Sequence, residues 1–236
     1  MSPYQSDLFG GSAGWNAQAW TSQDDRVRGG KSQSYLECGS GRGALAVFHG
    51  ILDIATLGGA GFASQRTTDD GSESGAPWDL SRGGGVLLRL GRGDGKRYTL
   101  TLKDEEASRR PDGREQSTVS WEYDFVGRNE EGGESYIPWS DFKPTYRGKA
   151  RPDAKPLDLK SVKRVGIMMR SFFGEQEGLF RLEIKSISVT EKSSHDKDNS
   201  SVAVKHSLES TSQFSEKPGY VAPKTTWKSL LCGFFR

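Results

Sequence analysis

Short runs in which apolar and polar residues alternate, separated by glycines, constrain the fold more than any other feature of this sequence. In residues 98–103 the side chains of Tyr98, Leu100 and Leu102 share one parity, so one face of a strand would be apolar. The chain has 30 glycines among 236 residues. It has no stretch of sustained helical periodicity. This pattern predicts an all-β protein with many turns.

The runs define the expected strands, which are 34–38, 44–52, 61–66, 86–90, 97–103, 120–126, 136–142, 161–170 and 179–190. The runs at 86–90 and 97–103 flank the glycine-rich segment 91–95, and this arrangement predicts a β-hairpin. In the last run the apolar parity changes between Ile184 and Ile187, which predicts a bulge near Lys185 and Ser186. The fold expected for residues 1–190 is an antiparallel, jelly-roll-like β-sandwich.

The remaining segments are expected to be irregular. Residues 1–23 form a lead-in with at most one short strand, and residues 67–84 and 144–156 form surface loops. Residues 191–217 are rich in Ser, Lys and Asp and are expected to be a disordered linker. The end of the chain, 218–236, is aromatic again. It would either pack on the sandwich or dock peripherally on a partner.

Composition excludes several classes of function. The net charge of +2 gives no field for nucleic acid. No apolar run has the roughly 20 residues of a membrane helix. Cys38 and Cys232 form neither a metal-ligand spacing nor a disulfide framework. No nucleophile elbow or histidine triad context is present, so we expect neither metal nor cofactor and no enzyme activity.

Two tryptophans leave a second class of function open. Trp78 and Trp139 each follow a proline in a loop or at a strand end. Exposed planar side chains on a β-sandwich would allow stacking on sugar rings, as in a carbohydrate-binding module. Packing of these tryptophans against the core is the alternative.

The most distinctive stretch runs from Asp24 to Ser34. A dense set of charges precedes Gly29 and Gly30, which predict a sharp turn. Small hydroxyl side chains then alternate with larger ones in the following strand. Arg66, at the end of the strand 61–66, would pair with Asp25 and hold this turn in one shape, or the two side chains would be separately solvated surface charges.

This stretch resembles the signature of the complex I intermediate-associated protein 30 family, usually written Asp-x-Val-Met-Gly-Gly-x-Ser-x-Ser. Arg28 stands where that family commonly has Met. Five further segments are similar to motifs of the family in the same order, and these are 59–66, 92–98, 137–148, 165–169 and 178–184. The resemblance covers most of the chain before residue 191.

The resemblance implies a galactose-binding-domain-like sandwich without catalytic machinery. It also implies a chaperone-like assembly factor that binds subunits or intermediates of mitochondrial respiratory complex I, together with other assembly factors. The first 25 residues contain no Lys or Arg but three Asp, which is not typical of a mitochondrial presequence. A cytoplasmic interaction protein that kept the fold is therefore an alternative to the matrix protein.

A partner-binding surface is expected around the signature turn, Arg66 and the late motif. Its candidate residues are Asp25, Arg26, Arg28, Gly29, Gly30, Ser32, Ser34, Arg66, Trp139, Asp141, Phe142 and Arg147. For the carbohydrate alternative the candidates are Trp78 and Trp139.

Overall fold

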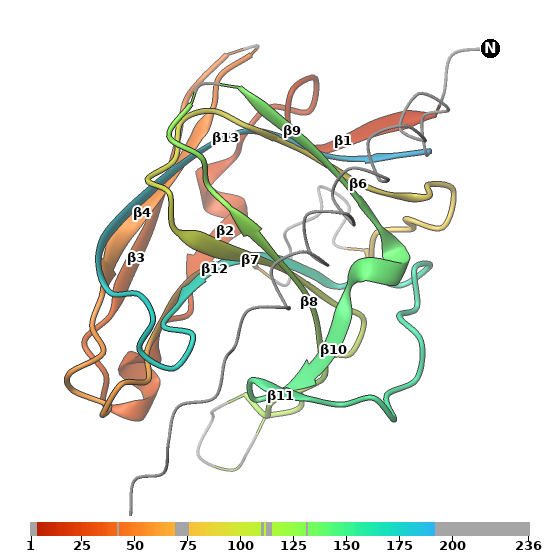
Figure 1. Ribbon diagram of the computed structural model, residues 1–236. Coiled ribbons are helices and arrows are strands. Elements are labelled where there is room, and N and C mark those ends of the chain that lie inside the picture. The colour runs from red at the N-terminus through yellow and green to blue at the C-terminus, as the bar shows by residue number, and fades with distance from the viewer. Residues whose placement is uncertain are drawn as a thin grey trace, which may run out of the picture. The chain divides into compact units, whose positions relative to one another are not determined.

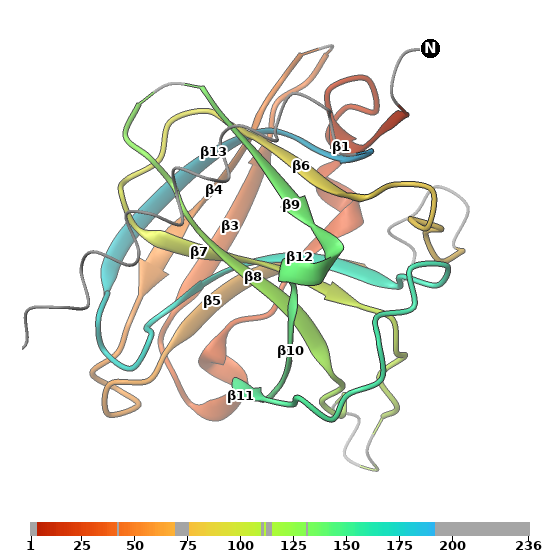
Figure 2. The same cartoon turned by 45° about the vertical axis from the view of Figure 1, so that its right-hand side comes forward.

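Two antiparallel sheets packed face to face make up the structure, a computed structural model that describes residues 4–41, 43–68, 76–109, 111, 115–130 and 132–191 (Figures 1 and 2). The first sheet has the order β3 (Gln33–Cys38), β4 (Ala46–Leu52), β13 (Gly178–Thr190), β6 (Gly85–Leu90), β9 (Gly133–Pro138), and β1 (Gln5–Gly10) also pairs with β13. The predicted all-β, jelly-roll-like sandwich is confirmed.

The second sheet has the order β11 (Lys149–Ala150), β10 (Lys143–Tyr146), β8 (Ser120–Val126), β7 (Arg97–Lys103), β12 (Arg164–Arg170), β5 (Phe62–Thr67), β2 (Trp20–Ser22). Helical structure in the described residues is limited to the short 3-10 helices η1 (Ala17–Ala19), η2 (Asp25–Arg28) and η3 (Trp139–Asp141). The lead-in thus holds two strands, β1 and β2, where at most one was expected. None of the helices in the described part of the chain has the length and apolar character needed to cross a membrane.

The core lies between the sheets and follows the alternation in the sequence. Tyr98, Leu100 and Leu102 of β7 are all buried, as predicted. In β8, Phe125 is buried and Trp121 packs partly buried against the same core. Burial of each large apolar side chain contributes about 1.5–3 kcal/mol.

The central strand β13 contains the predicted bulge. Its pairing with β6 shifts register between Ile184 and Ser186, so Ile184 and Ile187 both face the core despite their opposite parity.

The predicted hairpin between 86–90 and 97–103 is wrong, because β6 and β7 belong to different sheets. Gly91 donates its backbone N–H to the carbonyl of Glu183 in one sheet, and Gly93 donates to Arg128 just beyond β8 of the other. A Cβ on Gly93 would lie 2.4 Å from the backbone of Gly127. The glycines therefore let this segment cross from one sheet to the other at close range, which no side chain would permit.

Two further expectations are corrected. The strand expected at 136–142 ends at Pro138, and η3 begins at Trp139. The loop expected at 144–156 begins instead with the hairpin β10–β11. Its two-residue turn is Arg147, with φ of 52°, and Gly148, with φ of 74°, as a type I′ turn requires.

Residues 192–236 lie outside the described part of the chain. The disordered linker expected at 191–217 therefore lies outside the described residues, apart from Glu191. The aromatic segment expected at 218–236 lies wholly outside them.

Candidate functional site

The signature turn is built by η2 and the two glycines after it. Gly29 caps the helix with φ of 84°, a left-handed conformation that glycine adopts at least cost. Gly30 is required for a different reason, because a Cβ there would lie 2.2 Å from Oδ1 of Asp25. The first glycine turns the chain and the second leaves room for a buried carboxylate.

Asp25 is fully buried and has its own set of donors. Its Oδ1 accepts the backbone N–H of Ser32 at 3.0 Å, and its Oδ2 accepts the Ser32 hydroxyl at 2.7 Å and the backbone N–H of Phe62 at 3.2 Å. These three hydrogen bonds offset the free-energy cost of burying the Asp25 carboxyl group.

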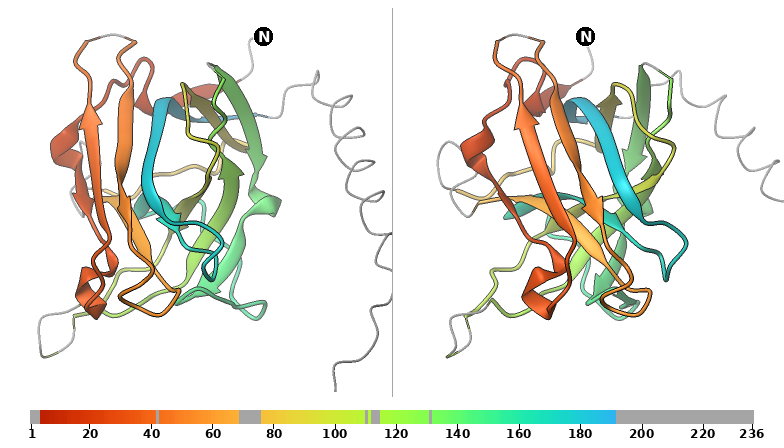
Figure 3. Two further views of the ribbon diagram at one scale, coloured as in Figure 1. Left: turned by 60° about the vertical axis from the view of Figure 1, so that its left-hand side comes forward. Right: turned by 90° about the vertical axis from the view of Figure 1, so that its left-hand side faces the viewer.

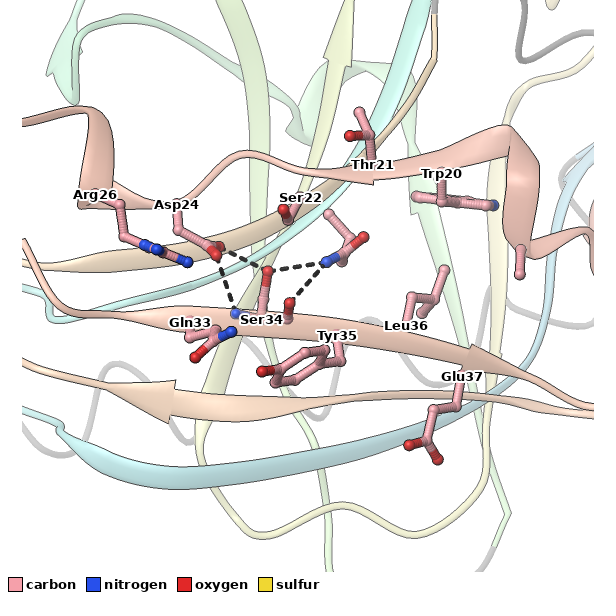
Figure 4. A pocket seen from close by; sticks show the side chains of 12 residues that line it. Trp20, Thr21, Ser22, Asp24, Arg26, Gln33, Ser34, Tyr35, Leu36 and Glu37 are labelled. Carbon is pink, nitrogen blue, oxygen red and sulfur yellow. Dashed lines mark hydrogen bonds between the residues drawn. The ribbon is translucent and has the colours of Figure 1, made fainter.

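Asp24 repeats the arrangement with the second serine of the signature. Its Oδ1 accepts the Ser34 hydroxyl at 2.6 Å and the backbone N–H of Ser64 at 2.9 Å, and its Oδ2 accepts the backbone N–H of Ser34 at 3.1 Å. Figure 4 shows the carboxylate of Asp24 directed at Ser34 across the space between the two chain segments.

We call Asp24, Asp25, Ser32 and Ser34 the signature clasp. The serines belong to, or lead into, β3 at the edge of one sheet, whereas the N–H groups of Phe62 and Ser64 belong to β5 in the other sheet. Each carboxylate therefore joins the two sheets at the edge where β3 lies beside β5. The alternating serines of the signature exist because each one meets one aspartate.

A groove of about 410 Å³ lies over the clasp between β2 and β3. Arg26, Gln33, Tyr35 and Glu37 line it together with the buried Asp24 (Figure 4). The guanidinium of Arg26 forms no ion pair with any described residue. In the part of the chain that the structure describes, no cluster of three His, Cys, Asp or Glu side chains could hold a metal ion.

The predicted pair between Arg66 and Asp25 is wrong. Arg66 lies on the outer face of β5, where it contacts Glu115 at 3.2 Å and donates to the carbonyl of Thr67. Arg164 contacts the same Glu115 at 2.8 Å. The carboxylate oxygens of Asp25 instead accept hydrogen bonds from Ser32 and Phe62.

The structure does not bring the candidate residues into one surface. β3 and β2 lie at one edge of the two sheets, whereas β9 and β10, which flank Trp139, lie toward the other. Of the candidates near the signature, Arg26, Arg28 and Gly29 are exposed, Gly30 and Arg66 are half-buried, and Asp25, Ser32 and Ser34 are buried. At the far edge, Asp141 and Arg147 are exposed, Trp139 is half-buried and Phe142 is buried.

Both tryptophans considered for sugar stacking are packed against the protein. The Trp139 indole donates to the carbonyl of Gly83 at 2.7 Å and its ring lies 6.0 Å from that of Phe142. The Trp78 ring makes an edge contact with Phe9 at 5.9 Å. Their geometry does not favour the carbohydrate alternative.

The two glycines of the signature should respond differently to substitution. We expect Gly30→Ala to lower the free energy of unfolding by about 2 kcal/mol, because its methyl group would displace the Asp25 carboxylate. Gly29→Asn should cost less than about 1 kcal/mol, since Asn tolerates the left-handed region and nothing lies within 4 Å. Urea unfolding of both variants checks this. Equal losses would contradict the steric role given to Gly30.

Burial raises the pKa of Asp24 above its ordinary 3.8, against the lowering effect of its hydrogen bonds to Ser34 and Ser64. Between 3.8 and the raised value the folded protein binds more protons than the unfolded chain, so this group's contribution to stability falls as pH rises. Asp24→Asn removes that titration. The difference in unfolding free energy, wild type minus variant, should fall as pH rises through this window, and a rising difference would contradict the raised pKa.

Comparison with known proteins places these features in a family. The model of the family described as complex I intermediate-associated protein 30 matches residues 8–184, which include the signature clasp. "Uncharacterized protein C9E9.15" of Schizosaccharomyces pombe (strain 972 / ATCC 24843) is 40% identical over 183 residues, covering 76% of this chain and 81% of that protein.

Among solved structures, the fold is similar to the family 11 carbohydrate-binding module of the cellulosomal cellulase Lic26A-Cel5E of Clostridium thermocellum. The TM-score is 0.51 at 14% identity, over 83% of this chain and 100% of the module. This similarity concerns the fold alone. The match of the family model and the 40% identical relative show that the chain belongs to the complex I intermediate-associated protein 30 family, and this membership suggests a role related to complex I assembly.

Proposed function

We propose that this protein is a non-enzymatic, protein-binding assembly factor for intermediates of mitochondrial respiratory complex I. The observation that carries the proposal is the family match over residues 8–184. An assembly factor of this kind binds a partly built subunit, covers apolar surface that the finished complex will bury, and is then released.

The chemistry of the signature supports a binding role. Asp24 and Asp25 are buried and hydrogen-bonded to the chain's own serines and backbone. Their role is therefore to hold the turn. The residues that the clasp displays outward are Arg26, Val27 and Arg28, all of them exposed. In this proposal the buried residues of the signature act indirectly, by fixing the residues that touch the partner.

Affinity purification of the tagged full chain from mitochondrial and cytosolic fractions tests the proposal, with the tag alone as the control. We expect complex I subunits and other assembly factors to be recovered from the mitochondrial fraction. Recovery from the cytosolic fraction of a partner set without complex I subunits would contradict the proposal and support an interaction protein that kept the fold.

A further inference from the structure

The most exposed large apolar side chain in the described residues is Phe173, at 98% exposure, followed by Leu179 at 77%. Phe173 lies in the loop 171–177 between β12 and β13, and Leu179 lies at the start of β13. A fully exposed phenylalanine contributes nothing to the core, so its position calls for another explanation.

The loop holds Phe173 outward at a conformational cost. Phe172 and Phe173 have φ of 45° and 62°, a region that bulky side chains rarely occupy, and Gly174 follows with φ of 90°. The carbonyl of Ser171 accepts the backbone N–H groups of Gly174 and Glu175, which closes the turn. Such strain of about 1–3 kcal/mol per residue persists only where surrounding contacts determine the conformation.

Those contacts hold Phe172 rather than Phe173. The guanidinium of Arg97 lies 3.9 Å from the centre of the Phe172 ring, and that of Arg170 lies 4.6 Å from it. The side chain of Gln176 donates to the carbonyls of Arg97 and Arg170 and accepts the backbone N–H of Arg97. One aromatic side chain is therefore fixed by the protein, and the next is presented to the outside in a preorganised position.

Leu179 has an apolar neighbour on the outer face of the same sheet. It pairs directly with Ile51 of β4, which is 44% exposed, so their side chains lie side by side. Two residues before Ile51 on β4, on the same face, His49 pairs with Tyr35 of β3. Tyr35 is 47% exposed, and its ring stacks on that of His49 at a centroid distance of 5.4 Å. The outer face of β3, β4 and β13 thus adds exposed apolar side chains, Leu179, Ile51 and Tyr35, to that of Phe173 in the loop that precedes β13.

The signature turn lies at the same end of the molecule (Figure 3). The loop 171–177 and η2 are both tied to the segment at Gly61 and Phe62: Ser171 donates to the carbonyl of Gly61, and Asp25 accepts from Phe62. Arg28 lies over the Phe62 ring at 5.5 Å. Arg26 and Arg28 form no ion pair with any described residue, so their charges remain available to a ligand.

We propose that Phe173, Leu179 and Ile51, together with Arg26 and Arg28 at the same end of the molecule, form a docking surface for a folded protein. The complementary partner has an apolar pocket for Phe173 with carboxylates at its border for the two arginines. Glu175 is paired with Arg97, whereas Glu177 is exposed and forms no ion pair with any described residue, so its carboxylate would be repelled by an anionic lipid surface, which favours a protein as the occupant. The inference rests on the proposed function, because the partner it specifies is a complex I subunit or assembly intermediate.

The test compares Phe173→Asn combined with Leu179→Ser against the wild-type chain in the tagged purification from mitochondria. Asn is among the residues that tolerate a positive φ, so the unfolding midpoint should be unchanged or raised. Recovery of complex I subunits should fall about 30-fold or more. Val126→Ser is the matched control, since Val126 is 48% exposed on the outer face of the other sheet, and it should keep full recovery.

A photo-crosslinking amino acid at position 173 of the full chain gives a second readout. A crosslink to a complex I subunit is expected, whereas a crosslink to lipid, to a second copy of the chain, or no crosslink would overturn the proposal. Equal recovery by the wild type and the double variant would overturn the docking surface and leave the proposed function standing. Absence of complex I subunits from the wild-type purification would overturn the proposed function and this surface with it.

Discussion

Asp25→Ala is expected to lower the free energy of unfolding by about 4 kcal/mol. The substitution removes a fully buried carboxylate and leaves two backbone N–H groups, those of Ser32 and Phe62, without the acceptor that they now share. It also frees the Ser32 hydroxyl from its 2.7 Å bond. The link from Ser32 through the carboxylate to Phe62 of β5 is lost at the same time, which leaves Asp24 and the hydrogen bonds of Ser34 with Ser64 and Gln65 to hold β3 against β5. Urea unfolding at neutral pH measures the loss.

A nearby acid provides the matched control for Asp25. Asp53 is solvent-accessible, and its carboxylate accepts only from Thr56 three residues on. Asp53→Ala should therefore lower the unfolding free energy far less than Asp25→Ala does. A loss below about 1 kcal/mol for Asp25→Ala would show that the signature carboxylates do not hold the sheets together.

Arg170→Leu should have the second largest effect, a loss of about 3 kcal/mol. Arg170 contacts Glu122 at 2.7 Å and Asp124 at 2.6 Å on the outer face of the second sheet. The Glu122 side chain is only 8% exposed, so its charge would stay buried with the Thr145 hydroxyl as its hydrogen-bond donor and with Lys103 as the nearby cation. Removing one partner of a buried pair costs more than the pair contributes, because the other charge stays desolvated.

A double-substitution cycle separates this effect from simple loss of packing. Glu122→Gln in the Arg170→Leu background removes the buried charge that has lost its ion-pair partner and should restore about 1–2 kcal/mol. No recovery would mean that Arg170 acts through its contact with the Phe172 ring rather than through the carboxylate. Since that contact also holds the loop 171–177, Arg170→Leu should weaken partner recovery as well as stability.

The alternation of side chains is enough to predict most of the strands and most of the core, but not β1, β2, β10 and β11. The parity change between Ile184 and Ile187 even placed the bulge in β13. The sequence does not reveal which strands share a sheet. The segments 86–90 and 97–103 would show the same alternation whether they paired with each other or lay in different sheets. The glycines at 91–95 are compatible with a tight turn and with a crossing between sheets, and only long-range contacts distinguish the two.

The signature was recognisable, but its internal chemistry was not. The sequence drew attention to Asp25, yet the donor to its carboxylate turned out to be Ser32, seven residues on, rather than Arg66. Phe172 and Phe173 were not singled out, since two aromatic residues before a glycine are unremarkable in a sequence. Their importance depends on positive φ angles and on guanidinium groups from two other strand positions, which a single sequence does not reveal.

The level of assembled complex I in cells lacking this protein tests the central claim most directly. Native gel electrophoresis should show less complex I in the deletion strain, an accumulated subassembly, and restoration of both by the wild-type chain. The folded Phe173→Asn, Leu179→Ser variant should fail to restore them. Complex I of normal amount and composition in the deletion strain would contradict the assembly role and leave a protein that shares the family's fold but does different work.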